Sequence, residues 1–392
     1  MNNEKNTIIQ IASLLEEASI PYTYIGEAAL FIQGVDLSIE HTELLVQWDA
    51  FTNCYNLFKD AARSPIEKTP KSAKFQVQVE GKNVTVRCLY NTTIKTDPYR
   101  ISVKLDEHTV WCKSLYCYLY DDHLSLYKEI IIAHLQQKQQ AFTEHNEKAW
   151  NQNNYQALIA RYGEPKHMAE KIKNNPEWRL YPFLKYMPNL EGKKVLHLLG
   201  SNGVKATALA LLGAQVTVVD FSKENAMFAQ ELAKEADVSI NYIVSDVFSL
   251  HIEKMADQYD YVLMELGVLH YFITLEPLMN LVRALLAKEG LFVLHEFHPI
   301  STKLISSTGK KHKIVGNYFD PTLHEQTVAF SKHMPDGVQE ELLQTVQRKW
   351  TIGELVTSVA SSGLCISVLE EEPNHKLHDI GLPKTFTLIS KK

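Results

Sequence analysis

Three stretches of the chain end in small or acidic residues whose order and spacing suggest a binding site. The loop Gly200–Gly203 follows one apolar run, Asp220 ends a second, and Asp246 follows a third that ends at Ser245. Small residues let a backbone approach a ligand, and a helix that begins directly after them presents free N–H groups. A carboxylate about 20 residues further on suits a ribose diol, and a second one can accept from an adenine amino group. The spacing therefore predicts a site for a nucleoside-containing cofactor.

Regular alternation of short apolar runs and amphipathic runs surrounds these residues. Alternation of this kind favours an α/β fold with a doubly wound, mostly parallel, Rossmann-like sheet, in which the carboxyl ends of the strands meet at the ligand. Two late strands separated by a loop are expected to close one edge as an antiparallel pair. The predicted strands are Lys194–Leu199, Gln215–Asp220, Ile240–Ser245, Tyr259–Glu265, Gly290–Phe297, Cys365–Glu370 and Thr385–Ser390, and the helices are Val204–Leu212, Ser222–Ala236, Leu275–Leu286 and one that starts with a Thr351–Glu354 capping box and ends near Gly363.

The glycine loop separates two classes of nucleoside-binding protein. A dinucleotide-binding domain needs the pattern G-x-G-x-x-G to hold a pyrophosphate. With glycines at 200 and 203, a third glycine would be needed at 205 or 206, where this chain has Lys205 and Ala206. The loop is therefore poorly suited to a pyrophosphate.

Residues 194–297 resemble the class I S-adenosylmethionine-dependent methyltransferases. More narrowly, Val195–Gly203 and Leu212–Ser222 are similar to a bacterial small-molecule group of that superfamily, and flanking segments extend the resemblance from about residue 150 onward. The resemblance implies that the loop lines the methionine part of S-adenosylmethionine, and it places the ribose and the adenine on the two acids. Many relatives have an acid that helps to orient the cofactor's amino group where this chain has His197, so His197 is expected either to weaken cofactor binding or to leave that task to a neighbour. The cofactor residues implied are Leu199, Gly200, Ser201, Asn202, Gly203, Asp220, Phe221, Ser245, Asp246, Val247, Glu265 and Leu266.

The acceptor side is predicted from the ends of the fourth and fifth strands. Methyl transfer from a sulfonium is an in-line displacement, so the protein mainly aligns the reactants, and a base is needed only for some acceptors. The candidate catalytic residues are Glu265, His270 and His298, and the candidate substrate residues are Tyr155, Arg161, Tyr271 and Tyr318. No metal is expected, because His295, Glu296 and His298 cannot all face one ion from a strand. The insertion from residue 299 to 349 is a candidate substrate lid.

The N-terminal part resembles the nucleotidyltransferase fold over roughly the first 130 residues, as a smaller α+β domain. Active members use a small-residue loop and three acids that hold the metal ions of a triphosphate. Here the loop offers Gly26 and Glu27, the acid pair falls on His41 and Glu43, and the later strand Val84–Cys88 has no acid. We therefore expect a degenerate domain, retained for docking or substrate binding.

Length and composition fit two domains, predicted at residues 1–140 and 141–392 with a polar helix tail or linker between them. The chain has a net charge of -6, which makes nucleic acid a less favoured partner than a small-molecule acceptor. Five scattered cysteines, no signal peptide and no apolar run long enough for a membrane span lead us to expect a cytoplasmic protein. Two other readings stay open: an S-adenosylmethionine-binding sensor without turnover, and a nucleotidyltransferase with a companion methyltransferase domain. None of these features sets an oligomeric state.

Overall fold

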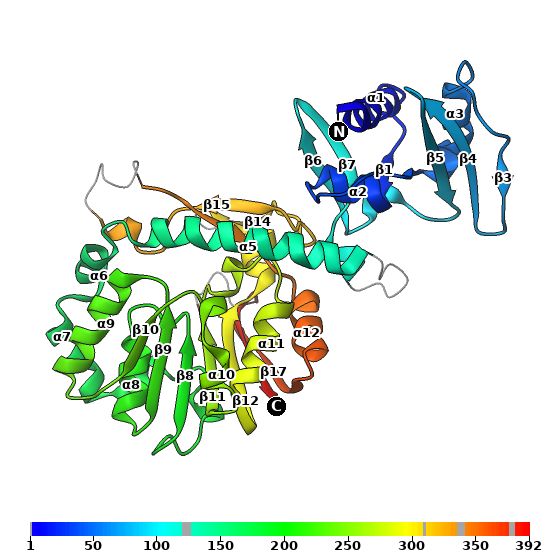
Figure 1. Ribbon diagram of the computed structural model, residues 1–392. Helices are drawn as coiled ribbons and strands as arrows, with labels where there is room; N and C mark the ends of the chain where they lie inside the picture. Colours follow the sequence, from blue (N-terminus) through cyan, green and yellow to red (C-terminus); the bar gives the residue numbers. More distant parts are fainter. Residues whose placement is uncertain (1, 120–126, 309–310, 335–341, 376–380) are drawn as a thin grey trace. The chain divides into compact units, whose positions relative to one another are not determined.

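The computed structural model describes residues 2–119, 127–308, 311–334, 342–375 and 381–392. The chain divides into two compact units, one of residues 1–137 with 319–321 and one of residues 138–318 with 322–392. The division falls inside helix α5 (Lys128–Trp150), which spans the predicted domain boundary at residue 140 (Figure 1).

The second unit is built on one sheet of seven strands, and its order is β10-β9-β8-β11-β12-β18-β17. Neighbours from β10 to β12 run parallel, whereas β18 is antiparallel to both β12 and β17. The predicted doubly wound sheet with an antiparallel closing strand is confirmed. The strands are β8 (Lys194–Leu198), β9 (Gln215–Asp220), β10 (Asn241–Val244), β11 (Tyr259–Glu265), β12 (Leu286–Phe297), β17 (Cys365–Pro373) and β18 (Pro383–Lys391).

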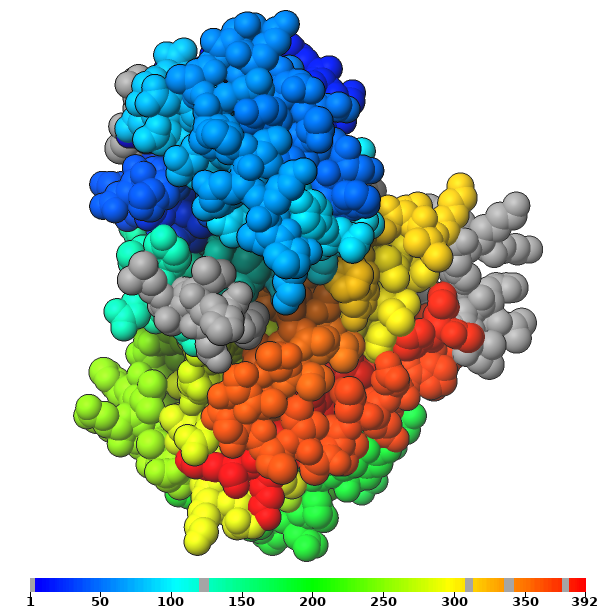
Figure 2. All heavy atoms as spheres, turned by 90° about the vertical axis from the view of Figure 1, so that its right-hand side faces the viewer, coloured from blue at the N-terminus to red at the C-terminus, as the bar shows by residue number. Residues whose placement is uncertain are grey.

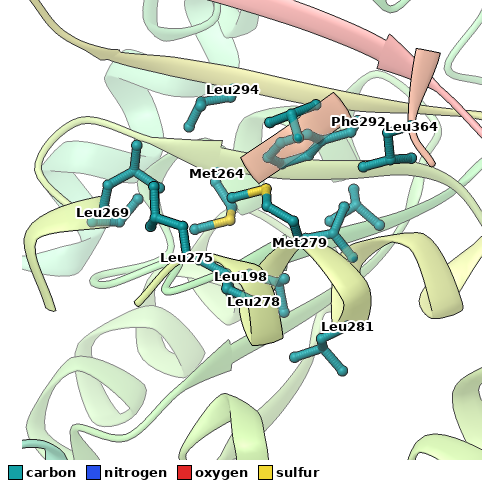
Figure 3. Close-up of a cluster of buried hydrophobic side chains, with 14 of the residues drawn as sticks. Leu198, Met264, Leu269, Leu275, Leu278, Met279, Leu281, Phe292, Leu294 and Leu364 are labelled. Atoms are coloured by element: carbon teal, nitrogen blue, oxygen red, sulfur yellow. The ribbon is translucent and has the colours of Figure 1, made fainter. Parts of the chain in front are cut away.

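Helices cover both faces of this sheet, as the continuous burial of β8 from Val195 to Leu198 requires. Val195 packs on the face covered by the first group of helices, and Leu196 and Leu198 pack on the opposite face. Met264 of β11 and Met279 of α11 point toward one another in this second layer (Figure 3). The first face carries α6 (Asn154–Tyr162), α7 (Pro165–Asn174), α8 (Val204–Leu211) and α9 (Lys223–Glu235), and the second carries α10 (Ile252–Met255), α11 (Glu276–Leu285) and α12 (Ile352–Ser361).

Local signals in the sequence set several helix ends. The Ser222 hydroxyl accepts from the backbone N–H of Asn225 and caps α9. The predicted capping box between Thr351 and Glu354 is present at the start of α12, which lies at the surface in Figure 2 (orange). Gly363, with a φ of 82°, follows the end of this helix in the left-handed conformation that glycine favours.

The insertion between β12 and α12 forms two small hairpins. Its elements are η8 (Ile300–Leu304), β13 (Ile305–Thr308), β14 (Lys311–Ile314), β15 (Leu323–Gln326), η9 (Ser331–His333) and β16 (Thr345–Arg348). The Asn146 side chain of α5 bonds both backbone groups of Val346, donating at 3.0 Å and accepting at 2.8 Å. The second hairpin is thereby held against the part of α5 that belongs to the same unit.

The first unit has a mixed sheet in the order β3-β4-β5-β2-β1-β7-β6. Strand β1 (Tyr22–Ile25) runs antiparallel to β2 (Thr42–Val46) and parallel to β7 (His108–Lys113), and β2 runs parallel to β5 (Lys82–Leu89). The hairpin of β6 and β7 was not predicted from the sequence. The remaining elements are β3 (Glu67–Lys68), β4 (Ser72–Val79), β6 (Arg100–Leu105), α1 (Asn2–Glu17), α2 (Gly26–Ile32), α3 (Phe51–Leu57) and α4 (Tyr116–Leu119). Among all described helices, none has the length and apolarity that crossing a bilayer requires.

Candidate active site

A cavity of about 530 Å³ opens at the carboxyl ends of the parallel strands in the second unit. This volume falls within the range of roughly 300–1,000 Å³ that is usual for small-molecule sites. The structure brings all the predicted cofactor residues except Gly203 to its wall. These residues are Leu199, Gly200, Ser201, Asn202, Asp220, Phe221, Ser245, Asp246, Val247, Glu265 and Leu266.

The loop after β8 is shaped by residues with positive φ. Leu199 and Ser201 have φ values of 50° and 48°, and Gly203 has 70°. A Cβ added to Gly200 would lie 2.6 Å from a methyl group of Val218, and one at Gly203 would lie 2.5 Å from the Cβ of Ala229. The glycines therefore allow the loop to pack against the sheet and α9, which holds the neighbouring residues at the cavity wall.

The Asp220 carboxylate is buried at the end of β9 and already accepts three hydrogen bonds. Its Oδ1 accepts from the Ser222 N–H at 2.9 Å and from the Asn225 amide at 3.3 Å, and its Oδ2 accepts from the Ser201 N–H at 3.0 Å. Burial raises the pKa of this carboxyl group, and the three donors oppose that rise. Because a carboxylate has about four acceptor positions, Oδ2 can still accept from one ribose hydroxyl.

Asp246 and Val247 lie at the next strand end along the sheet. Burial raises the pKa of the Asp246 carboxyl group, while the backbone N–H groups of Phe248 and Val247 favour its charged form. Val247 is buried and offers an apolar surface beside this acceptor. The pair suits a flat heterocycle that also donates a hydrogen bond.

Glu265, at the end of β11, forms an ion pair with Lys205 of α8 inside the cavity. Burial and the nearby Arg179 lower the pKa of Lys205, while the adjacent Glu265 carboxylate favours the charged form of the lysine. The His197 Nε2 lies 3.9 Å from the Glu265 Oε1. Burial holds the pKa of His197 at about 3, so its ring is neutral and no ion pair forms there. Glu265 is thus the neighbour that can bind a cofactor ammonium in place of an acid at position 197.

The segment after β11 borders the cavity and is anchored by Glu296 of β12. The Glu296 Oε1 accepts from the N–H of Gly267 at 2.5 Å and of Phe297 at 2.7 Å. Its Oε2 accepts from Val268 at 3.0 Å and Leu269 at 3.3 Å. Burial raises the pKa of this carboxyl group and the four donors oppose it. Glu296 therefore positions the backbone from which the candidate residues His270 and Tyr271 project. The sequence singled Glu296 out only as a possible metal ligand.

Aromatic and cationic side chains complete the cavity wall. Tyr271 accepts a 3.0 Å hydrogen bond at its hydroxyl from the Trp150 indole. The Phe330 ring meets Trp150 and Tyr162 edge-on, with centroids 6.0 and 5.9 Å apart. His270 also lines the cavity, and burial lowers its pKa to about 3, so the imidazole is neutral near neutral pH. The cations on this wall are Arg161, Arg179, Lys205 and Lys332.

Three predicted residues lie outside the cavity lining and make structural contacts instead. The Tyr155 hydroxyl donates to Glu231 at 2.6 Å. The buried His298 ring bonds Glu371 through Nε2 at 2.6 Å and accepts from the Ile300 N–H at Nδ1. The Tyr318 hydroxyl accepts from the Ile352 N–H at 3.1 Å, at the start of α12. Their side chains are directed to neighbouring elements, which the strand-end pattern did not reveal.

Sequence reasoning missed several residues of the wall. Arg179 lies in a segment that flanks the predicted core, and the sequence distinguishes Lys205 only as a departure from the dinucleotide-binding glycine pattern. Trp150 is the last residue of α5, in the polar stretch that the sequence predicts to be a helix tail or linker. Other unpredicted members come from α5, β16 and the insertion, which approach the strand ends only in the folded chain, and they include Thr143, Asn146, Thr327, Ala329, Lys332 and Gln347.

In the first unit, the residues at the presumed phosphate loop bind one another. The Glu27 Oε2 accepts from the backbone N–H groups of Glu40 and His41 at 2.7 and 2.8 Å. The Glu43 carboxylate pairs with Arg87 of β5 at 2.8 Å. Within the described part of the chain, no group of three metal-ligating side chains is present. The one retained acid is thus matched to a protein cation.

Residues 197–294 match a family model described as a methyltransferase domain. These residues run from β8 to β12 of the second unit and are similar to a methyltransferase domain. The prediction of a class I S-adenosylmethionine-dependent enzyme is confirmed at the level of this family, and the assignment rests on the match together with the strand order.

Solved structures similar to this chain include two methyltransferases. One is an S-adenosylmethionine-dependent methyltransferase from Mesorhizobium loti, at 21% identity and a TM-score of 0.44, covering 55% of this chain and 98% of that one. Another is magnesium protoporphyrin IX methyltransferase from Synechocystis PCC 6803, at 16% identity and a TM-score of 0.39, covering 63% of this chain and 97% of that one. No curated protein matches the sequence.

Proposed function

We propose that this protein transfers the methyl group of S-adenosylmethionine to a small-molecule acceptor. One observation carries the proposal: the acids at three strand ends of the methyltransferase domain, Asp220, Asp246 and Glu265, line one cavity. In the proposed arrangement Asp220 accepts from the ribose, Asp246 from the adenine amino group, and Glu265 binds the ammonium group. The small-residue loop then borders the methionine chain.

The methyl group would be directed toward the aromatic part of the wall. In an in-line displacement the carbon–sulfur bond breaks as the acceptor atom bonds the methyl carbon, so alignment and exclusion of water supply most of the catalysis. His270 lines the cavity as a neutral imidazole, and because burial lowers its pKa to about 3 it is a weak base, so its proposed role is to accept a hydrogen bond from the acceptor and orient it. A cavity of about 530 Å³ favours a small acceptor over a polymer segment.

Titration calorimetry of the full chain with S-adenosylmethionine tests the proposal first. Asp220→Asn should weaken binding about tenfold or more, since a hydrogen bond to a charged group is worth roughly 1.5–3 kcal/mol. Asp237→Asn is the matched control, because Asp237 is exposed and lies outside the cavity. Absence of binding to the unaltered chain would overturn the proposal.

Turnover is tested with methyl-labelled S-adenosylmethionine and a library of small acceptors. A labelled product detected by mass spectrometry supports the enzyme. Binding without turnover on any acceptor favours a sensor. Incorporation of a labelled nucleoside triphosphate in the presence of Mg²⁺ would instead favour the nucleotidyltransferase alternative.

A further inference from the structure

The cavity wall carries more positive than negative side chains, although the whole chain is acidic. Four cations and three carboxylates line it among the described residues, and the chain as a whole has a net charge of -6. Lys205 and Glu265 neutralise one another. The remaining cations, Arg161, Arg179 and Lys332, form the cationic patch. Among the described residues of the wall, only the carboxylates of Asp220 and Asp246 remain to balance its positive charge.

A bound methyl donor increases this imbalance. S-adenosylmethionine carries a sulfonium and an ammonium cation against one carboxylate, so it adds positive charge to the cavity. Its carboxylate can pair with one member of the patch, and the remaining positive charge still lacks a counterion. Positive charges gathered in a partly buried site repel one another and favour an anionic ligand.

The members of the cationic patch come from elements that pack together. Arg161 on α6 and Arg179 of η4 (Pro176–Arg179) flank the Tyr162 ring, with guanidinium carbons 5.8 and 6.0 Å from its centroid. Lys332 lies on η9, which packs on α6. Burial, Arg161 and Lys332 all lower the pKa of His333, so both cations lie near this histidine.

No described carboxylate forms an ion pair with any member of the patch. The ion pairs found in the described residues of the second unit involve other cations, such as Lys205, Lys173 and Arg348. The Arg179 Nε is buried and has no hydrogen-bond partner among the described residues. A guanidinium offers paired N–H groups in a geometry that matches the oxygens of a carboxylate or a phosphate.

Resting on the proposed methyl transfer, we infer that the acceptor is an anionic small molecule whose carboxylate or phosphate group binds the cationic patch. The rings of Trp150, Tyr162 and Phe330 beside the patch suit an apolar or aromatic body. The patch thus selects the acceptor by charge and holds its other end toward the methyl group.

The experiment measures binding of simple anions to the full chain saturated with S-adenosylhomocysteine. Benzoate, phenyl phosphate and the neutral benzamide are titrated separately by calorimetry. We expect at least one of the two anions to bind, and benzamide to bind at least about tenfold more weakly than that anion. The relative affinity of benzoate and phenyl phosphate then tells a carboxylate site from a phosphate site.

Arg161→Gln and Lys332→Gln should each weaken binding of the preferred anion about fivefold, because both side chains are exposed at the rim and partly screened. Arg283→Gln and Lys166→Gln are matched controls, exposed and outside the cavity. Equal affinity for benzamide, no anion binding at millimolar concentration, or loss no greater than in the controls would each overturn the inference. Failure of S-adenosylhomocysteine to bind would instead show that the proposed function is wrong, and the inference would fall with it.

Discussion

Replacing Glu296 by glutamine tests whether one buried carboxylate positions the cavity edge. Its two oxygens accept four backbone N–H groups, from Gly267, Val268, Leu269 and Phe297, at 2.5–3.3 Å. A glutamine amide keeps one oxygen and turns the other acceptor into a donor. Two backbone donors then lose their partner and face an N–H group.

The size of the effect follows from these contacts. A hydrogen bond to a charged group contributes roughly 1.5–3 kcal/mol, so the loss of two predicts about 3 kcal/mol or more. The amide nitrogen is expected to face Val268 and Leu269, whose bonds are the longer pair, which places the loss at the low end of this range. At about 2–4 °C per kcal/mol for a unit of this size, the melting temperature should fall by about 6–12 °C.

Two assays separate positioning from general stability in Glu296→Gln. Thermal unfolding gives the shift, and calorimetry with S-adenosylmethionine at a temperature where the variant is folded should show about tenfold weaker binding. Glu371→Gln is the control, because it removes a more exposed carboxylate whose hydrogen-bond partner among the described residues is His298, in the neighbouring part of the sheet. Unchanged melting and unchanged affinity in Glu296→Gln would refute the positioning role.

Three further changes have outcomes that follow from the structure. The pKa values of His197, His270 and His295 are about 3, 3 and 4 against an ordinary 6.5, so below pH 6.5 the unfolded chain binds protons that the folded chain does not. Stability should therefore fall as the pH drops from 6.5 toward 4, by about 1.4 kcal/mol per pH unit for each histidine, and a flat urea-unfolding series over that range would contradict this. Gly203→Ala places a methyl group 2.5 Å from α9 at a φ of 70° and should cost about 2 kcal/mol or more in chemical denaturation, so unchanged stability would show that the loop relaxes freely. Glu265→Gln should weaken S-adenosylmethionine binding about tenfold in calorimetry, with a surface glutamate variant measured as the control. Unchanged affinity would show that Glu265 does not bind the cofactor.

Local sequence patterns were enough to predict the sheet of the second unit. The strands ending at Asp220 and Glu265 begin and end at the predicted residues, and the capping box at Thr351 is where the sequence indicates it. These signals act within a few residues: a buried strand is an apolar run, and a cap is a side chain beside its own helix. Strand ends of a parallel sheet meet at one edge, so their cofactor residues could be predicted together.

Only the tertiary structure decided which other residues reach the cavity. Lys205 pairs with Glu265 across two elements, and Glu296 anchors a segment that precedes it in the chain. Lys332, far along the insertion, lies with Arg161 on one wall. No local pattern encodes such meetings, because they depend on how hairpins and helices pack and not on neighbouring residues. The amino-acid sequence thus determined the chemistry at the strand ends. Long-range packing decided the Lys205–Glu265 ion pair, the cavity edge anchored by Glu296 and the excess of positive charge on the cavity wall.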